Sequence, residues 1–273
     1  MSDGTRPRVS VVTIAYNDRA GLEATVASTA AQDWESVEHI VVDAGSSDGT
    51  VDYLRALGER VKWTSEPDKG RYDGMNKGVA RSTGEWLWFM NSGDTFARPD
   101  SVRTAIEALA RHPERRWGYG LSRIGDVDSC IGIGGSVPFS LPRFLLGGHP
   151  IPHQAVFISR ELHDDIGGYS IDFGLAADQT YLMAAALRAE PLVLADVLCH
   201  FDKGGAGSTR SMRHHFQDMA RSRKVNGATV TGLARLDDVL SFTVAVQKKV
   251  ERGQRTVLRS AGVRRRAEAM RHG

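Results

Sequence analysis

Four short apolar runs, separated by helical segments, constrain the fold of the first hundred residues. The runs have strand length and are rich in β-branched or aromatic residues, as strands usually are. They lie at residues 9–15, 39–42, 61–64 and 86–90, with helical composition at 20–31 and 51–57. Apolar strands that alternate with helices are typical of a parallel sheet covered on both faces. The sequence therefore predicts an α/β fold with a mostly parallel central sheet.

Polar turns follow these strands at the points where each strand ends. They contain five aspartates: Asp43, Asp48, Asp68, Asp73 and Asp94. Open α/β sheets bind ligands beyond the carboxyl ends of their strands, so we expect residues 66–94 to form the floor of an active site. Carboxylates gathered there need cations or hydrogen-bond donors, and a divalent metal carrying a diphosphate would supply the cation. Each aspartate alone is equally compatible with a turn or cap role.

The usual glycine-rich nucleotide motifs are absent. Residues 15–21, after the first strand, do not form the Gly-x-Gly-x-x-Gly turn of dinucleotide-binding proteins, and no Walker-type phosphate loop occurs. The glycines at 132–135 do not open a clear helix, so they carry little weight as a phosphate site. A nucleotide would be held in another way.

The pattern is weaker after residue 100. Helices are expected at 101–111, 141–146 and 176–188, strands at 117–121, 155–158 and 192–197, and a glycine-rich loop at 200–209. From about residue 212 the chain is helical and increasingly basic in composition.

Composition predicts a cytoplasmic protein. No apolar run reaches the roughly 20 residues that cross a bilayer, and residues 1–8 lack the apolar core of a signal peptide. Cys130 and Cys199 are too few and too isolated for a disulfide framework or a zinc site, so we expect both to be reduced.

The C-terminal end differs in charge from the rest of the chain. Residues 248–273 contain nine Lys or Arg and two Glu, a net charge of +7. Because the whole chain carries +2, the remainder carries −5. Such an end is either solvated or an anchor for anionic lipid or another acidic partner. Peripheral contact with the inner face of the membrane is thus an alternative to a freely cytoplasmic location.

Four ordered motifs resemble the signatures of family 2 glycosyltransferases. They read VVDAGSSDGT from Val41, EPDKGRYDGMNKG from Glu66, GEW from Gly84 and NSGD from Asn91. The resemblance covers roughly residues 8–210. It implies the GT-A fold and an inverting glycosyltransferase of the hexosyltransferase type, which moves a sugar from a nucleoside diphosphate to a hydroxyl acceptor with Mn²⁺ or Mg²⁺.

The resemblance also implies a set of donor-binding residues. They are Ala15, Tyr16, Asn17, Asp43, Asp68, Asp73, Asn76, Asn91, Ser92 and Gly93. Among them, Asp43 would accept a hydrogen bond from a ring N–H of the base. Asp68 would border the base and ribose, with Asp73 and Asn76 nearer to the sugar.

Asp94 matches the last acid of the family's Asp-x-Asp element and would bind the metal. Asn91 and Ser92 stand where relatives carry the earlier acids of this element, so a single carboxylate remains. Waters and phosphate oxygens would then complete the coordination.

An acid near the start of a helix in the second half is the candidate general base. Inverting transfer needs a base that takes the proton of the acceptor hydroxyl as the anomeric carbon is attacked. The segment at residues 176–179 resembles the family element and places Asp178 in that role, with Asp172 as the rival. Alternatively, Asp178 is a helix N-terminal acid that complements the helix dipole.

Two further segments resemble family elements of the second half. His153 and Gln154 match a pair that many relatives place near the acceptor. The loop at 200–208 resembles one that closes over the diphosphate, with Lys203, Gly204, Gly205 and Ser208 as the phosphate contacts. A structural histidine and a flexible glycine loop are the alternatives.

These expectations divide the chain at residue 210. Residues 1–210 would form the GT-A domain, with a donor half at 1–100 and an acceptor half at 101–210, and residues 211–273 a helical, basic extension. The expected partners are a UDP-, dTDP- or GDP-linked sugar and an acceptor that is a glycolipid, a lipid-linked saccharide or a secondary metabolite. Nucleic acid is not expected, and an oligomer is compatible with the sequence.

Two other functions are less compatible with the sequence than transfer. A non-catalytic nucleotide-sugar-binding relative or scaffold subunit would share the fold, but it would have no need of Asp94 and Asp178. A nucleotidyltransferase is disfavoured because no Gly-x-Gly-Thr-Arg loop follows the first strand.

Overall fold

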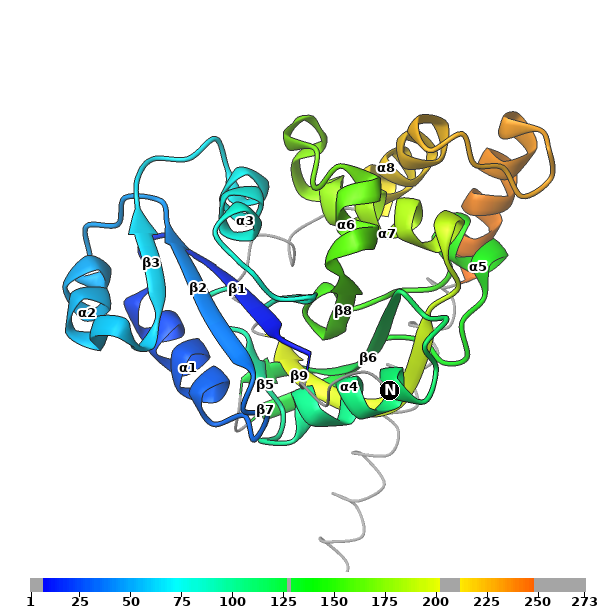
Figure 1. Ribbon diagram of the computed structural model, residues 1–273. Coiled ribbons are helices and arrows are strands. Elements are labelled where there is room, and N and C mark those ends of the chain that lie inside the picture. The colour runs from blue at the N-terminus through cyan, green and yellow to red at the C-terminus, as the bar shows by residue number, and fades with distance from the viewer. Residues whose placement is uncertain (1–6, 127–128, 202–211, 248–273) are drawn as a thin grey trace, which may run out of the picture.

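Strand β1 (Val9–Ala15) lies inside a parallel half-sheet and is buried along almost its whole length. β2 (Val37–Asp43) and β4 (Trp86–Phe89) pair with it on either side, and β3 (Lys62–Ser65) extends the half-sheet beyond β2. Figure 1 shows this arrangement in the computed structural model. The structure describes residues 7–126, 129–201 and 212–247. The predicted α/β fold with a parallel first half is confirmed.

Helices cover both faces of this half-sheet. They are α1 (Arg19–Ala30), α2 (Thr50–Leu57), α3 (Arg71–Ala80) and α4 (Ser101–Ala110), and a 3₁₀ turn, Gly58–Arg60, follows α2. Successive strand residues point to opposite faces. Val12 of β1 accordingly shares a core cluster with Met75 of α3, whereas Val11 shares another with Ile106 of α4. In Figure 1, α3 lies on the opposite side of the sheet from α1.

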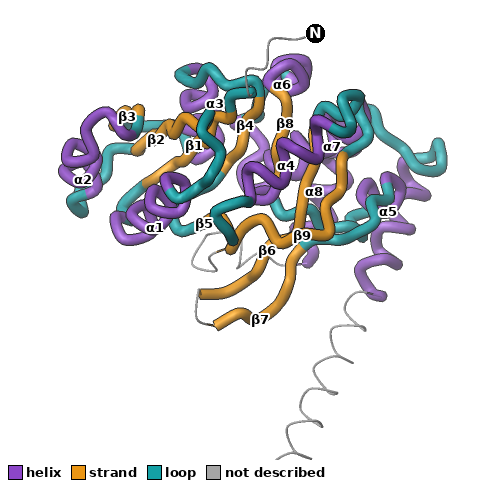
Figure 2. The backbone as a smooth tube through the Cα atoms, turned by 60° about the horizontal axis from the view of Figure 1, so that its bottom comes forward, coloured by secondary structure: helices purple, strands orange, loops and turns teal. Residues whose placement is uncertain are grey.

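Strand β8 (Val156–Ser159) makes the sheet mixed, because it runs antiparallel to β4 and to β6 (Trp117–Asp126). β9 (Leu192–Phe201) is parallel to β6, while β7 (Ser129–Gly134) is antiparallel to β6 and β5 (Thr95–Phe96) to β9. The strand order is β3-β2-β1-β4-β8-β6-β9-β5, with β7 beside β6, as Figure 2 shows.

The second half adds helices on the α3 side of the sheet. These are α5 (Leu141–Leu145), α6 (Arg160–Ile166), α7 (Ala177–Arg188), α8 (Met212–Val225) and a helical segment at residues 234–247. Leu162 of α6, Tyr181 of α7 and Met219 of α8 belong to the same core cluster as Met75 of α3. No helix in the described ranges is long and apolar enough to cross a membrane.

Three elements escape the sequence pattern for physical reasons. β5 is two residues long, β7 is glycine-rich with Ile131 and Ile133 exposed, and α6 is mostly charged. The expected loop beginning at His200 is wrong for its first two residues. β9 continues to Phe201, because His200 pairs with Thr95 on one side and Arg123 on the other.

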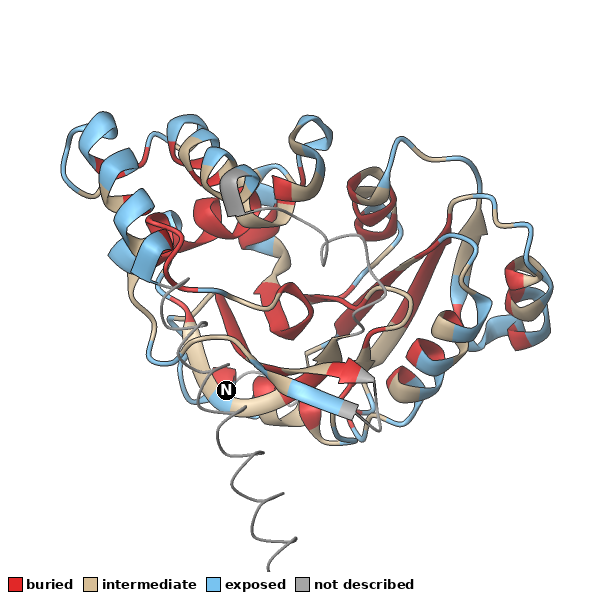
Figure 3. Cartoon of the chain, turned by 180° about the vertical axis from the view of Figure 1, so that it is seen from behind, coloured by how far each residue is buried: buried red, intermediate tan, exposed pale blue. Residues whose placement is uncertain are grey.

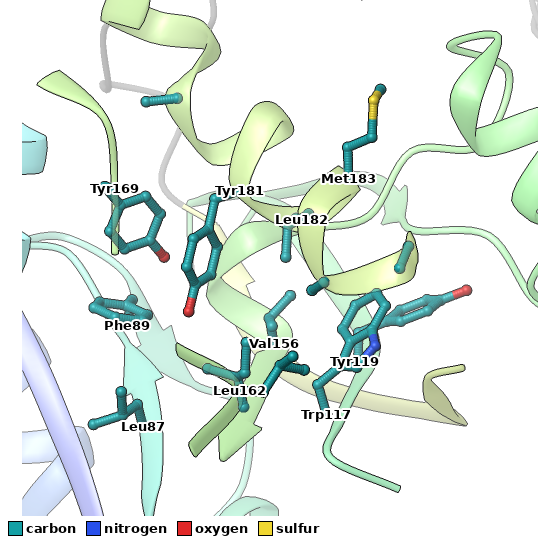
Figure 4. Packing of buried hydrophobic residues seen from close by; sticks show 14 of the residues in the cluster. Leu87, Phe89, Trp117, Tyr119, Val156, Leu162, Tyr169, Tyr181, Leu182 and Met183 are labelled. Atoms are coloured by element: carbon teal, nitrogen blue, oxygen red, sulfur yellow. The ribbon is translucent and has the colours of Figure 1, made fainter. Parts of the chain in front are cut away.

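A cluster of aromatic rings fills the core beneath the second half (Figure 4). Tyr169 stacks on Tyr181 with ring centroids 4.2 Å apart and meets the edge of Phe89 at 5.1 Å. The Tyr181 hydroxyl lies 2.7 Å from Nδ1 of His163, and burial lowers the pKa of His163 to about 4. This histidine is therefore neutral near pH 7 and acts as a hydrogen-bonded core residue. Figure 3 shows that buried residues concentrate along the strands and exposed ones on the outer helices.

Gly78 of α3 allows the helix to approach β1 closely. A Cβ at this position would overlap Cγ1 of Val12, which is fully buried, and would lie 3.5 Å from Cγ2 of Val42. Helix propensity favours Ala over Gly by up to about 1 kcal/mol, but overpacking of a core usually costs about 1–3 kcal/mol. The steric overlap should therefore outweigh the gain in helix propensity, and an alanine at this position should destabilise the protein.

We expect Gly78→Ala to lower the free energy of unfolding by about 1–2 kcal/mol, as measured by urea denaturation. Gly132→Ala is the matched control, because a Cβ on Gly132 meets no atom within 4 Å. This control should change stability by less than about 0.5 kcal/mol. A stabilised Gly78→Ala variant would contradict the close approach.

Candidate active site

A cavity of about 910 Å³ opens at the carboxyl ends of β1 and β4, between the parallel first half and the mixed second half. Its wall combines turns after β1, β2 and β4 with the start of α3 on one side. The other side comprises Ser122 and Ile124 of β6, the segment at residues 150–154, and Asp178 of α7. The edge predicted from the strand ends therefore carries a cavity large enough for a nucleotide-sized ligand.

Nine of the predicted site residues line this cavity. They are Ala15, Tyr16, Asp68, Asn91, Ser92, Asp94, His153, Gln154 and Asp178. Asn17, Asp43, Asp73, Asn76 and Gly93 lie close by but outside its wall. Lys203, Gly204, Gly205 and Ser208 fall outside the described residues, immediately after Phe201, which lines the cavity at the end of β9.

Asp43 organises the loop after β2 from a fully buried position. Its Oδ2 accepts hydrogen bonds from the backbone N–H of Ser46 at 2.9 Å and the hydroxyl of Ser65 at 2.6 Å, and Oδ1 accepts one from the hydroxyl of Ser46. Asn17, at φ +48°, ties the β1 turn to the same loop, because its Oδ1 accepts from the backbone N–H of Ser47 at 2.8 Å. These two residues shape the wall from behind, and Ala44 forms the surface itself.

The turn into α3 contributes both a carboxylate and a cation. Oδ1 of Asp68 accepts from the backbone N–H of Gly70 at 2.8 Å, which holds the carboxylate at the cavity wall. Arg71, the first residue of α3, also lines the cavity. Asp73 is turned to its own helix: a hydrogen bond from the Lys69 backbone N–H lowers its pKa, and Lys77 Nζ lies 3.3 Å from Oδ2.

Asn76 joins the two halves of the protein. Its Nδ2 donates to the carbonyl of Tyr169 at 2.8 Å, and its Oδ1 accepts from the backbone N–H of Tyr169 at 2.9 Å. Both ends of the amide are thus bonded to one residue of the second half. The structure places Asn76 as a clamp behind the cavity rather than on its surface.

The turn after β4 places the polar residues Asn91 and Asp94 at the cavity wall. Asp94 is almost fully buried and lines the cavity. Asn91 also lines it, and Oδ1 of Asn91 is a buried acceptor with no hydrogen-bond partner among the described residues. Thr25 fixes the turn by donating to the Asp94 carbonyl at 2.8 Å, and Gly93 adopts φ +91°.

This donor set fits a divalent cation with few protein ligands. No group of three or more His, Cys, Asp or Glu side chains with metal-binding geometry occurs in the described part of the chain. One carboxylate with an amide oxygen is nevertheless a suitable partial shell for Mg²⁺ or Mn²⁺, which keep water and phosphate ligands.

Across the cavity, His153 and Asp178 lie on the wall that the second half provides. His153 belongs to a 3₁₀ turn, His153–Ala155, and its Nε2 lies 2.7 Å from the hydroxyl of Tyr169. Burial lowers the pKa of His153, against an opposing effect of the nearby Asp178 charge. The backbone carbonyl of Gln154 accepts a hydrogen bond from Nε1 of Trp88 at 2.7 Å. His153 is therefore neutral near pH 7, because burial lowers its pKa, and its hydrogen bond with Tyr169 fixes the orientation of the ring.

Asp178 and its rival Asp172 occupy different surroundings. Asp178 is half-buried in the first turn of α7, with Oδ1 2.7 Å from the backbone N–H of Gln179. Asp172 is exposed on the 3₁₀ segment Ile171–Ala176 and is not part of the cavity wall. The geometry favours Asp178 as the acid that a ligand would meet.

Two charged wall residues were missed by sequence reasoning. Arg71 occupies the variable position of the EPDKGRYDGMNKG motif, so the motif gave no signal for it. Asp18 caps α1 by accepting from the backbone N–H of Gly21 at 3.1 Å, and its Oδ2 accepts from the hydroxyl of Ser92 at 2.7 Å. Its place beside the β1 turn was visible in the sequence.

Comparison with known proteins decides the family. An uncharacterised glycosyltransferase from Mycobacterium tuberculosis is 46% identical over 219 residues, which cover 79% of this chain and 82% of the relative. Residues 10–119 also match the sequence model described as Glycosyl transferase family 2. The chain belongs to glycosyltransferase family 2. The resemblance of its motifs is thereby confirmed, and the protein is a nucleotide-sugar-dependent glycosyltransferase.

Other relatives of this glycosyltransferase are more distant. A PGL/p-HBAD biosynthesis glycosyltransferase from Mycobacterium bovis is 33% identical over 179 residues, 63% of this chain and 67% of the relative. S. aureus TarS 1-349, solved with UDP-GlcNAc, has a TM-score of 0.65 at 18% identity over 80% of this chain and 66% of that one. The mannosyltransferase PcManGT of Pyrobaculum calidifontis, solved with GDP-Man and Mn²⁺, has a TM-score of 0.62 at 19% identity. The match covers 89% of this chain and 74% of that one. These two structures confirm the GT-A fold.

The clamp in this glycosyltransferase can be tested by Asn76→Ala, which leaves the Tyr169 N–H and carbonyl without their side-chain partners. We expect the free energy of unfolding to fall by about 2–3 kcal/mol. Lys77→Ala, on the same helix, removes partly exposed ion pairs and one exposed hydrogen bond to the Pro67 carbonyl, and it should cost about 0–1 kcal/mol. Equal losses in the two variants, measured by urea denaturation, would contradict the clamp.

Proposed function

We propose that this glycosyltransferase inverts the anomeric centre of a hexose as it transfers it from a nucleoside diphosphate to an acceptor hydroxyl. The observation that carries the proposal is that Asp94, Arg71 and Asp178 line one cavity. A donor-side cation site and phosphate-binding side chain thus face a carboxylate from the opposite half. Transfer requires this juxtaposition, because the donor and the base must meet at one carbon atom.

The nucleoside would lie against the turns that follow β1 and β2. Tyr16, Ala44 and Pro67 give this part of the wall apolar surface, and Asp68 adds an acceptor for ribose hydroxyls. Asp43 is fully buried and accepts hydrogen bonds from Gly45, Ser46 and Ser65, so a hydrogen bond from the base would require the loop to open and expose its carboxylate. We therefore retain Asp43 as a base-side residue that acts chiefly by holding Ala44 in place.

The charge of the wall supports a metal-assisted diphosphate site. The described charged residues on it are Asp18, Asp68, Asp94, Asp178 and Arg71. A diphosphate entering beside more carboxylates than cations is repelled unless further positive charge accompanies it. Mn²⁺ or Mg²⁺, held by Asp94 with the Asn91 amide oxygen nearby, would supply this charge and stabilise the departing diphosphate.

Asp178 would remove the proton from the acceptor hydroxyl. The hydroxyl oxygen forms a bond to the anomeric carbon as the bond from that carbon to the diphosphate oxygen breaks, and the nucleoside diphosphate leaves with the electron pair. Neutral His153, fixed by Tyr169, would border the acceptor and accept or donate a hydrogen bond there. Lys203, Gly204, Gly205 and Ser208 remain proposed phosphate contacts on the basis of the motif.

The acceptor side of the wall supports a partly apolar acceptor. Ile124, Pro150, Ile151 and Pro152 line it. A relative at 33% identity is named for PGL/p-HBAD biosynthesis. We therefore place a glycolipid first among the proposed acceptors. The division at residue 210 into a transferase domain and a helical, basic extension is part of the same proposal.

Asp178→Asn tests the base. We expect transfer to fall by about 10²–10⁴-fold, because the amide cannot take the proton, while thermal shifts with a panel of UDP-, dTDP- and GDP-sugars stay unchanged. Asp172→Asn is the matched control and should retain full activity. If Asp178→Asn loses donor binding as much as transfer, the base assignment is wrong. Tight donor binding by a wild type that turns over no donor would favour the non-catalytic alternative.

Asp94→Ala tests the cation site. In the presence of Mn²⁺ we expect donor affinity to fall by about tenfold or more, since the metal loses its carboxylate, whereas with a chelator the variant and wild type should bind the donor alike. Titration calorimetry with both metal conditions measures this difference. Asp73→Ala, whose carboxylate faces its own helix, should keep the metal effect. Equal donor affinity of the wild type with Mn²⁺ and with chelator would refute the assignment.

A further inference from the structure

The helical segment at residues 234–247 buries two polar side chains against the protein body and leaves a row of large apolar side chains exposed. A surface helix normally buries its apolar side chains and exposes its polar ones. Here Asp237 and Ser241 are buried, together with Ala245. The outer face carries large apolar side chains instead.

Specific hydrogen bonds fix the inward face. Arg223 of α8 is buried and donates to the Leu145 carbonyl at 2.8 Å, to the Ser241 hydroxyl at 2.9 Å and to Oδ1 of Asp238 at 2.6 Å. Asp237 Oδ2 accepts from the backbone N–H of Val230 at 2.8 Å. Asp238 is exposed, but Arg223, Asp237 and Ser241 are buried and hydrogen-bonded, so rotating the helix to bury its apolar side would leave these three side chains unsatisfied.

The outward face is a contiguous apolar stripe, here called the outer stripe. Its members and exposed fractions are Leu233 64%, Leu236 44%, Val239 59%, Phe242 66% and Val246 47%. The helical members recur at intervals of three or four residues, which places them along one side of the helix. Single exposed apolar residues are ordinary, but a continuous exposed stripe marks an interaction surface.

The charge of the following sequence indicates what covers this surface. Residues 248–273 continue directly from the stripe and carry a net charge of +7, against −5 for the rest of the chain. An apolar helix face joined to a cluster of Lys and Arg is the combination that binds anionic bilayers, by shallow insertion and electrostatic attraction together. A second copy of the chain would instead bring two such basic segments close together.

We infer that the outer stripe docks this protein onto an anionic lipid surface, with the helix lying in the plane of the bilayer. The segment lies at the outer edge of the second half, beside α5 and α8, where Figure 1 draws it in orange. Docking there goes beyond the transfer reaction, because it uses no residue of the cavity.

The docked helix is connected to the acceptor side of the cavity through packed elements. Arg223 links it to α8, and α8 is joined to α7 by Ser222 and Thr180, whose hydroxyls lie 2.7 Å apart. Thr180 is two residues from Asp178 on the same helix. The half of the protein that carries Asp178 would thus be the half that contacts the lipid surface. This placement suits the proposed acceptor, a glycolipid, which resides in the membrane.

Vesicle sedimentation tests the docking. Full-length protein should pellet with phosphatidylcholine vesicles that contain phosphatidylglycerol, remain in solution with phosphatidylcholine alone, and be released by salt. The double variant Val239→Ser, Phe242→Ser should bind about tenfold more weakly. Ile133→Ser, an exposed apolar residue on β7, is the matched control and should bind as the wild type does.

Three results would overturn the inference. The first is wild-type protein that fails to pellet with anionic vesicles. The second is a double variant that binds normally while truncation after Gln247 abolishes binding, which would assign the effect to the tail alone. The third is a wild-type dimer in sedimentation velocity that the double variant dissociates, which would make the stripe a self-interface.

Two parallel measurements keep the outcomes distinct. Thermal melting should show that the double variant is folded, because both residues are exposed. Hydrolysis of the sugar donor in solution should be equal in the wild type and the double variant. Absent hydrolysis with intact vesicle binding would count against the proposed transfer and leave the docking surface supported.

Discussion

The paired hydrogen bonds between Asn76 and the backbone of Tyr169 tie together the two halves whose residues form the walls of the cavity. Asn76 lies on α3, which packs on the parallel half-sheet, and Tyr169 immediately precedes the segment that leads into α7. The ring of Tyr169 then fixes His153 through its hydroxyl and stacks on Tyr181. The Asn76 amide is therefore connected through Tyr169 to residues on the opposite wall, in addition to the pairing of β4 with β8 that continues the sheet between the two halves.

The motif residues fall into two groups, those that line the cavity and those that hold its wall from behind. Asp68, Asp94 and Asp178 reach the cavity, whereas Asp43 is bonded to its own loop and to Ser65 at the end of β3, and Asn76 to the other half. Residues of the second group are no less necessary to a site made from turns. A turn has no regular ladder of hydrogen bonds, so side chains must satisfy its backbone groups if it is to present a ligand-binding surface in one conformation.

The sequence predicted those elements whose burial requires a mainly apolar run of residues. β1, β2 and β4 each contain a run of buried apolar residues because helices cover both faces of the half-sheet, and the polar turns after them mark the cavity. β7 and α6 were missed because they are stabilised by pairing or packing of one side only, which leaves no apolar run. Arg71 and the clamp by Asn76 were missed for another reason. A motif records residue identity at a position, and whether a side chain points to a ligand or to a neighbouring backbone depends on tertiary contacts.

The electrostatics of the cavity link the fold to the chemistry. Carboxylates reach it from the N-cap of α1, the turn before α3, the first turn of α7 and the turn after β4. These are turns and helix starts, where an acid is locally favoured. The acids that stabilise these turns and helix starts thus give the wall an excess of negative charge. Among the described wall residues, Arg71 partly offsets this charge. Such a wall holds a cation more readily than a bare diphosphate. A cation bound together with the diphosphate would resolve this conflict, and the turn that carries Asp94 also carries Asn91, whose Oδ1 has no hydrogen-bond partner among the described residues.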